Sequence, residues 1–363
     1  MDVAILGAGL SGLSCAIELE KYGVEPVIFE KRSCVGDRFV NAEAMFSILN
    51  RPVKDSLGYL ADRYKINLKP IDEVTGLVIH SKNEMSTIEG DIGYTNIRGR
   101  HEDSFECQLA RQVKSKINFH SCSEYQEVVR DFEHVVLATG DGEYALQQYN
   151  YRCDLTCSIK GATVEGTFTT NMPHVWFNYE ILPKGYAWMI PYSNKEANVV
   201  IAYPDYPEAE IYDVDKMWNI FFDLACKDLN QNLIITDRFQ ISHYIMGICE
   251  HAKIGNTYFA GNCFGALSPG LGFGQFASIL TGVYAAMDIC GIDKYDELVK
   301  PLFENYDHSL TLRRFLEKQD DDSFDKLVKS SNLKSIDKLI SHIFGTDSSF
   351  DLLKWITPFL HKK

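Results

Sequence analysis

The sequence predicts an α/β fold with three parts: a Rossmann-type domain built from discontinuous segments, an antiparallel-sheet domain and a helical C-terminal region. Three observations predict it. An apolar run at residues 3–6 leads into a glycine-rich turn, a helical pattern and a second apolar strand at residues 24–29. Apolar strands that end in small residues, near residues 137 and 259, return the chain to this first unit. Short β-type runs bounded by turn residues fill the segments between them, which is typical of an antiparallel sheet.

The changes of pattern along the chain set the expected domain boundaries. Residues 1–65, 101–150 and 251–295 form the Rossmann-type domain, residues 66–100 and 151–250 the antiparallel-sheet domain, and residues 296–363 the helical region. The expected helices cover residues 42–65 (with Met45, Ile48 and Leu49 on one face), 104–115, 208–230 and 275–290. The expected strands cover residues 74–80, 85–88, 117–120, 134–137, 159–163, 167–169, 174–179, 185–191, 197–203, 234–241 and 257–259.

The first glycines have the spacing of a dinucleotide-binding turn. Gly7 allows the tight turn, Gly9 lets the backbone approach a pyrophosphate, and Gly12 lets the helix pack closely on the strand. The helix begins at Leu10 and Ser11, where unpaired N–H groups and the positive end of the helix dipole favour phosphate. A glycine-rich turn in an ordinary α/β unit is the alternative.

Charged residues follow the second strand. Glu30 lies about 20 residues beyond the glycines, where a carboxylate accepts hydrogen bonds from ribose hydroxyls. Lys31 opens a loop that runs back along the dinucleotide in such folds, and Gly36 permits close backbone approach there. Arg38 in the same loop either neutralises a pyrophosphate charge or is an exposed surface arginine.

Two later segments favour FAD over NAD(P), because a simple NAD domain would not need chain that returns near position 260. One is an apolar strand that ends in Ala-Thr-Gly. The other is a strand followed by Gly-Asn, a glycine-rich turn and a long apolar helix, whose N-terminus can stabilise negative charge on a reduced flavin. The candidate cofactor residues in these segments are Ala138, Thr139, Gly140, Gly261, Asn262, Gly270, Gly272, Phe273 and Gly274.

An aromatic face marks the second domain. Tyr186, Trp188 and Ile190 alternate along one strand and share a face, and the preceding strand adds further aromatic residues at 176–179. Such a face is either ordinary core or the wall of an apolar substrate cavity opposite the flavin. Tyr186 and Trp188 are the candidate substrate-site residues, and Tyr186 is a candidate proton donor.

The composition limits the class of protein. A formal net charge of −14 argues against a nucleic-acid partner. The ten cysteines are scattered, and Cys153 and Cys157 lack the second pair of a zinc site, so we expect reduced thiols, no metal and a cytoplasmic location. No run of about 18 apolar residues is present, and a strand that begins at Val3 argues against a signal peptide. Residues 351–363 combine apolar residues with terminal lysines, so they either touch a membrane surface or dock on the protein itself.

Four segments together carry a family resemblance: Gly7-x-Gly9-x-x-Gly12 with Glu30, Ala138-Thr139-Gly140, Tyr186-x-Trp188-x-x-Pro191, and Gly261-Asn262 with its glycine-rich turn. In this order they resemble the geranylgeranyl reductase family of FAD-dependent oxidoreductases, a branch of the p-hydroxybenzoate hydroxylase-like superfamily. The resemblance covers roughly residues 1–300. Two departures stand out: Gly-Asn replaces the family's Gly-Asp, and Asp141-Gly142 lacks the downstream serine and arginine of the NAD(P)H-linked hydroxylases.

The resemblance implies hydride transfer from reduced FAD to C=C bonds of an apolar, isoprenoid-type substrate, with NAD(P)H or reduced ferredoxin as the electron donor. The expected partners are therefore an apolar small molecule or lipid and an electron-donor protein, with peripheral membrane contact. Two alternatives stay open. One is a flavin-dependent monooxygenase of an aromatic or apolar substrate, and the other is an FAD-binding electron-relay or partner-binding protein.

Overall fold

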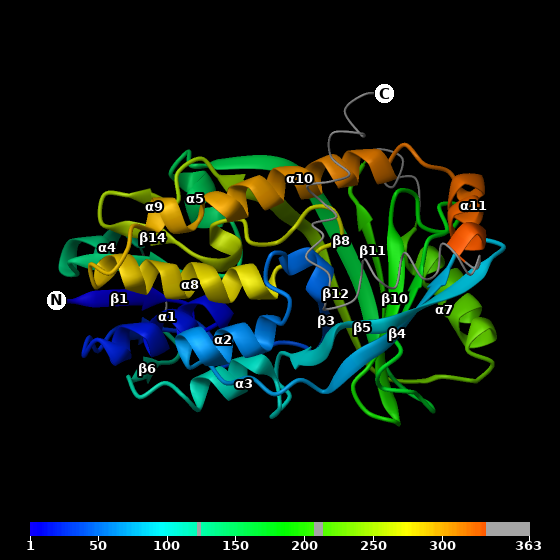
Figure 1. The fold of residues 1–363 in the computed structure, drawn as a ribbon, viewed down its shortest axis with the longest axis horizontal. Helices are drawn as coiled ribbons and strands as arrows, with labels where there is room; N and C mark the ends of the chain where they lie inside the picture. The colour runs from blue at the N-terminus through cyan, green and yellow to red at the C-terminus, as the bar shows by residue number, and fades with distance from the viewer. Residues whose placement is uncertain (122–124, 207–212, 332–363) are drawn as a thin grey trace.

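The computed structural model describes residues 1–121, 125–206 and 213–331, and it contains two sheets (Figure 1). One sheet and its helices occupy the N-terminal side of the molecule, on the left of Figure 1. A larger sheet occupies the other side. The mixed α/β fold class is therefore confirmed.

The first sheet is the expected Rossmann-type sheet. Five of its six strands are parallel, and a short antiparallel strand forms one edge. In spatial order the strands are β13 (Lys253–Ile254), β14 (Thr257–Phe259), β7 (His134–Leu137), β1 (Val3–Leu6), β2 (Val27–Phe29) and β6 (Ile117–Asn118). The predicted return of the chain from two distant segments is confirmed, because β7 and β14 extend the sheet beside β1.

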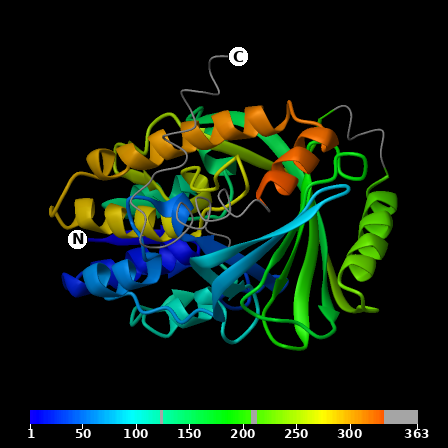
Figure 2. The same cartoon turned by 45° about the vertical axis from the view of Figure 1, so that its right-hand side comes forward.

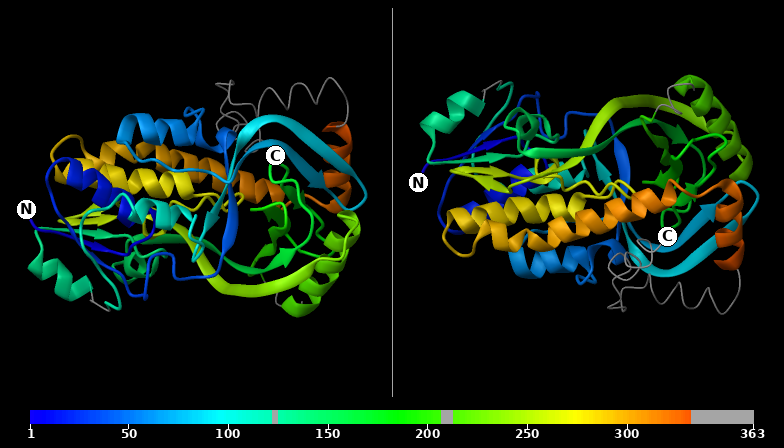
Figure 3. Two further views of the ribbon diagram at one scale, coloured as in Figure 1. Left: turned by 90° about the horizontal axis from the view of Figure 1, so that it is seen from below. Right: turned by 90° about the horizontal axis from the view of Figure 1, so that it is seen from above.

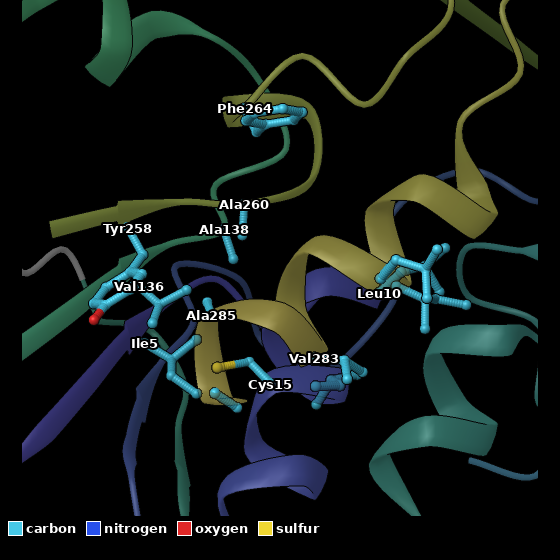
Figure 4. Close-up of a cluster of buried hydrophobic side chains, with 14 of the residues drawn as sticks. Ile5, Leu10, Cys15, Val136, Ala138, Tyr258, Ala260, Phe264, Val283 and Ala285 are labelled. Atoms are coloured by element: carbon cyan, nitrogen blue, oxygen red, sulfur yellow. The ribbon is translucent and has the colours of Figure 1, made fainter. Parts of the chain in front are cut away.

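Helices α1 (Leu10–Lys21) and α8 (Gln275–Ile289) pack against each other and share the core of this sheet (Figure 4). Two glycines allow the close packing of α1. A Cβ added at Gly282 of α8 would overlap the Ser11 carbonyl oxygen of α1, and one added at Gly12 would overlap the Gly7 carbonyl oxygen in the turn beneath α1. Gly7 itself has a φ of 109°, a conformation that glycine adopts readily.

The second sheet has eight strands and is antiparallel except where β4 and β9 run parallel. It is strongly curved: β4 and β5, in cyan, and β12, in yellow-green, lie on opposite sides of it and bend towards each other (Figure 3). In spatial order the strands are β12 (Ile234–Cys249), β8 (Tyr151–Glu165), β11 (Glu196–Pro204), β10 (Tyr186–Pro191), β9 (His174–Trp176), β4 (Asp72–His80), β5 (Met85–Arg98) and β3 (Asn41–Phe46).

The two faces of this sheet have different neighbours. On β10, Ala187 and Met189 belong to a hydrophobic core with helix α7 (Val214–Asp228), which contributes Trp218 and Phe221 to it. The alternate residues of β10 turn to the opposite, concave face. Since α7 covers only one face, the concave face is left to the site between the two sheets.

The other helices connect and cover these layers. Helix α10 runs from the first sheet towards the second (Figures 1 and 3). The helices outside the α1–α8 pair and α7 are α2 (Ser56–Tyr64), α3 (Phe105–Ala110), α4 (Tyr125–Asp131), α5 (Glu143–Gln147), α9 (Tyr295–Leu298), α10 (Lys300–Leu316) and α11 (Asp321–Ser331). Two 3₁₀ turns lie at Ser47–Asn50 and Gly261–Cys263.

Several predicted elements were wrong in kind or extent. Residues 41–46 form strand β3, not the start of a helix, and the helix in this segment begins only at Ser56, where the Asp55 side chain accepts from the Gly58 N–H. Residues 167–169 are not a strand, and the helix expected over residues 104–115 covers only Phe105–Ala110. Residues 332–363, with the predicted membrane-contact segment, lie outside the described residues, as do residues 207–212.

Within the described ranges, none of the helices is both long enough and apolar enough to cross a bilayer.

Candidate cofactor and substrate site

A cavity of about 1010 Å³ lies between the two sheets. It begins at the carboxyl ends of β1, β2 and β7, where doubly wound sheets bind their ligands, and continues over the concave face of the second sheet. All the predicted site residues except Gly12 line it. They are Gly7, Gly9, Leu10, Ser11, Glu30, Lys31, Arg38, Ala138, Thr139, Gly140, Tyr186, Trp188, Gly261, Asn262, Gly270, Gly272, Phe273 and Gly274.

The glycine turn leaves open space at the cavity surface. A Cβ added at Gly9 or at Gly140 would meet no heavy atom within 4 Å, apart from chain neighbours. Gly12, by contrast, lies beneath the turn, where its missing side chain lets α1 approach β1. This is the arrangement in which phosphate groups can reach backbone N–H groups at a helix start.

The Glu30 carboxylate is held at the rim of this space. One of its oxygens accepts from the Ala8 N–H and the other from the Arg32 N–H, both at 2.9 Å. Two backbone donors fix the plane of the carboxylate, and each oxygen keeps a second lone pair for a ligand hydroxyl. Glu30 therefore presents a carboxylate of fixed orientation at the cavity surface.

Arg38 belongs to a partly buried group of charges at the junction of the sheets, here called the junction cluster: Arg38, Glu43, Arg98 and Glu106. Arg98 donates from Nε to Glu106 Oε1 at 2.8 Å and from Nη1 to Glu43 Oε2 at 3.2 Å. Arg38 Nη2 lies 3.7 Å from Glu43 Oε1. These contacts join β3, β5, α3 and the loop after β2, so they fix the second sheet to the cofactor domain.

The junction cluster leaves two buried polar atoms available to a ligand. Arg38 Nε and Glu106 Oε2 have no hydrogen-bond partner among the described residues. Burial alone would raise the pKa of Glu43, but Arg98 and Arg38 hold it below its ordinary value, so Glu43 is charged. Burial lowers the pKa of Arg38, and the nearby charge of Arg98 lowers it further. An anion bound beside Arg38 would offset the free-energy cost of holding its charge away from water. The Arg38 side chain is 33% exposed, lines the cavity and lies beside Glu43, so it is not an isolated surface arginine.

Asn262 lies where the two cofactor segments meet. Its Nδ2 donates to the Tyr244 hydroxyl oxygen at 2.9 Å and to the Gly140 carbonyl at 3.3 Å. The Tyr244 hydroxyl in turn donates to the same carbonyl at 2.9 Å. These bonds fix the Asn262 side chain at the cavity surface, and they bring strand β12 of the second sheet onto the cofactor domain.

The glycine-rich turn before α8 is held from two sides. The Ser309 Oγ of α10 accepts from the Gly270 N–H at 2.9 Å. From the second sheet, the Tyr186 hydroxyl donates to the Leu271 carbonyl at 2.6 Å. Burial raises the pKa of Tyr186, so its proton stays on the oxygen and in this bond. The turn thus presents the α8 N-terminus to the cavity in a fixed position.

The far end of the cavity is apolar. Leu77 and Ile79 from β4, Val175 and Phe177 from β9 and the segment after it, and Trp188 from β10 line it. The rings of Phe177 and Tyr186 lie 6.0 Å apart and those of Tyr186 and Trp188 lie 5.3 Å apart. The predicted aromatic face is therefore a cavity wall.

Trp176 does not belong to this cavity wall. It is 2% exposed, packs with α7 on the convex side, and donates from its ring N–H to Asp228 Oδ2 at 2.8 Å. The expectation that Trp176 shares the face of Tyr186 and Trp188 was wrong, because Trp176 pairs with Ala187 and so shares that residue's orientation.

Sequence reasoning missed several residues that line the cavity: Phe46, Ile48, Leu49, Glu43, Arg98, Glu106 and Tyr244. The apolar members fell in the segment interpreted as a helix, and the charged members come from separate elements. No local pattern marks them as members of one site.

Comparisons with known proteins agree with this geometry. Residues 1–175 match the family model described as pyridine nucleotide-disulphide oxidoreductase. The structure is similar to that of a geranylgeranyl bacteriochlorophyll reductase-like protein from Thermoplasma acidophilum, with a TM-score of 0.72, 19% identity and coverage of 99% of this chain and 97% of the other. The chain has the fold of the FAD-dependent oxidoreductases.

Two further similar structures are of enzymes that are named for other reactions. The flavin-dependent brominase Bmp2 has a TM-score of 0.66 at 14% identity, over 99% of this chain and 97% of the brominase. Aklavinone-11 hydroxylase, solved with FAD and aklavinone, has a TM-score of 0.54 at 15% identity, over 80% of this chain and 62% of the hydroxylase. The resemblance expected from the sequence is confirmed at the level of this oxidoreductase fold.

The residues of the cavity fit FAD. Open space beside Gly9 and Gly140, the oriented Glu30 carboxylate and the unpartnered Arg38 Nε suit a ribose and a pyrophosphate. The α8 N-terminus and the turn at 270–274 face the cavity next to Tyr186 and suit the flavin ring.

Proposed function

We propose that this flavoprotein reduces C=C bonds of an apolar, isoprenoid-type substrate. The observation that carries the proposal is the continuity of the cavity: the cofactor end opens directly onto a wall of aliphatic and aromatic side chains. The likeness to the geranylgeranyl bacteriochlorophyll reductase-like protein supports it.

The apolar wall performs the binding. Tyr186 and Trp188 hold the reacting part of an extended hydrocarbon beside the flavin position, while Leu77, Ile79 and Phe177 bury its remainder. Burial of each methylene group contributes about 0.8 kcal/mol, so a prenyl chain gains enough to bind without polar contacts.

When bound and reduced, FAD supplies hydride to one carbon of the double bond, and a proton to the other carbon completes the saturated bond. NAD(P)H or reduced ferredoxin is the proposed source of the two electrons. The Tyr186 proton is engaged with the Leu271 carbonyl, so we assign this hydroxyl to holding the flavin-side turn and assign the proton to water.

The test is an anaerobic half-reaction. Purified protein is reconstituted with FAD, reduced with dithionite and mixed with geranylgeraniol, and the flavin absorbance and saturated product are followed. The proposal expects reoxidation without oxygen and one reduced double bond per flavin. Retained reduced flavin with every prenyl substrate would overturn it.

A flavin-dependent brominase and a hydroxylase solved with FAD share the fold, so reactions other than reduction stay open. Reoxidation only on admission of oxygen, with substrate hydroxylation, would assign the chain to the monooxygenase alternative. Reoxidation by an added redox protein, without any change in an apolar substrate, would assign it to electron relay.

A further inference from the structure

Helix α11 packs behind the apolar wall of the cavity. Its Phe324 is 3% exposed and stacks on Phe177, with ring centroids 5.1 Å apart and planes 15° apart. Phe177 in turn lines the cavity and neighbours Tyr186. Phe324 is therefore the second layer of the wall, directly behind the last aromatic residue that a substrate would touch.

The N-terminal turn of α11 is attached to the segment after β9. Asp321 accepts from the Tyr179 N–H at 2.6 Å and from the Glu180 N–H at 3.2 Å. The Tyr179 ring also meets Phe324 edge-on, with centroids 5.0 Å apart. These contacts fix the helix to one rim of the apolar end.

The next turn of α11 is attached to the opposite rim, the turn between β4 and β5. Asp325 accepts from Ser81 Oγ at 2.6 Å and from the Asn83 N–H at 3.0 Å, and Lys329 pairs with Glu84 at 3.2 Å. Figure 2 shows α11, in orange, between the cyan hairpin and the green strands. The helix thus bridges both rims and places Phe324 between them.

Burial along α11 is one-sided. Phe324 and Val328 are each 3% exposed, whereas Leu327 is 63% exposed on the same helix. The apolar face is thus directed at the cavity wall, and α11 contributes to the core only there.

We propose that Phe324 sets the length of hydrocarbon that the cavity accepts. This inference rests on the proposed function, because it takes the apolar end as the place where the substrate chain terminates. A substrate chain ends against Phe177, and Phe177 cannot move aside because Phe324 lies stacked behind it. Phe324 is therefore a specificity-determining residue supplied by the helical C-terminal region.

Replacing Phe324 by alanine would leave space behind Phe177. The Phe177 ring could then move into this space and lengthen the cavity. Each further methylene group that becomes buried raises affinity about fourfold. The gain is confined to substrates longer than the wild-type limit, because shorter chains already fit.

The experiment compares Phe324→Ala with Leu327→Ala, a matched change on the exposed side of α11. FAD-loaded protein is titrated with geraniol, farnesol and geranylgeraniol, and with linear alcohols of matched length, by quenching of tryptophan fluorescence. We expect wild-type affinity to stop rising at one chain length and Phe324→Ala to move this limit at least one prenyl unit further. The longest ligand should then bind at least tenfold more tightly, while Leu327→Ala keeps the wild-type profile.

An unchanged length limit in folded Phe324→Ala, as judged by circular dichroism, would overturn the inference. Phe324→Trp gives a second test that keeps an aromatic ring, and we expect it to leave the limit unchanged or to shorten it. A longer limit in Phe324→Trp would also contradict the inference. The titration measures binding, so its result is independent of whether the bound alcohols are reduced. A shifted limit without turnover would refute only the reductase proposal.

Discussion

Arg98→Met should strongly destabilise the protein, because it removes the cation shared by the buried carboxylate of Glu106 and the half-buried carboxylate of Glu43. Arg98 is 14% exposed in its side chain and contacts both Glu106, at 2.8 Å, and Glu43, at 3.2 Å. Removing one member of a buried ion pair typically costs about 3–5 kcal/mol, since the remaining charge stays buried without a partner. The contacts of Arg38 with Glu43 offset part of this cost, which places the expected loss near the lower value.

The double variant Arg98→Met/Glu106→Leu separates the pair energy from general packing damage. It removes one charge of each sign and leaves Arg38 to neutralise Glu43. We therefore expect its loss to be smaller than the sum of the two single losses by at least about 2 kcal/mol. Arg100→Met is the control: Arg100 pairs with Asp237 at the surface, where such a pair contributes about 0–1 kcal/mol.

The assay is equilibrium urea unfolding of the FAD-free protein, followed by circular dichroism and by tryptophan fluorescence. Agreement of the two probes tests whether both sheets unfold together, as the junction cluster predicts. A loss below about 1 kcal/mol for Arg98→Met, or strictly additive losses in the double variant, would refute the assigned role of the cluster.

Three other predictions follow. Gly9→Val should preserve folding, because nothing lies within 4 Å of an added Cβ, but it should weaken FAD binding at least 100-fold. Dialysis against FAD measures the affinity, and a wild-type flavin content in the variant would contradict the prediction. Tyr186→Phe should keep bound FAD but slow anaerobic substrate reduction by about tenfold, because the hydrogen bond to the Leu271 carbonyl is lost. The pH dependence of the rate should stay as in the wild type, and a shifted pH–rate profile would instead indicate that Tyr186 is the proton donor. Burial lowers the pKa of His80 and of His174 to about 4, so the unfolded chain binds more protons than the folded chain below about pH 6.5. The free energy of unfolding should therefore be highest above that pH and fall as the pH drops towards 4. His80→Gln should flatten this fall in the urea midpoints, and an unchanged slope would contradict it.

The sequence could bring the candidate cofactor residues together because each part of that end of the cavity is local. Gly7, Gly9 and Gly12 lie in one turn, and the strand–turn–helix pattern around them has a characteristic period. Buried parallel strands also have strong apolar runs, so β1, β7 and β14 could be placed in one sheet before their pairing was seen.

The second sheet was harder because its strands depend on distant partners. Residues 42–49 place Met45, Ile48 and Leu49 at helical spacing, yet β3 forms because Ala42 pairs with Ile97 and Met45 with Tyr94. That pairing joins segments about 50 residues apart, and tertiary contacts override the local pattern.

The sequence also could not predict which face of the sheet a single side chain is on. Trp176 and Phe177 are adjacent and both aromatic, but only Phe177 faces the cavity, because the register of β9 on β10 assigns Trp176 to the convex side. The junction cluster likewise joins charges from four elements, and isolated arginine and glutamate residues are ordinarily read as surface residues.

The most direct test of the central claim is a titration of deflavinated protein with FAD, monitored by flavin fluorescence, with NAD⁺ and NADP⁺ as competitors. The cavity geometry predicts one FAD bound per chain, with quenched fluorescence from a ring beside Tyr186 and Trp188, and no displacement by either competitor. Absence of FAD binding, or displacement of FAD by stoichiometric NAD⁺, would contradict it.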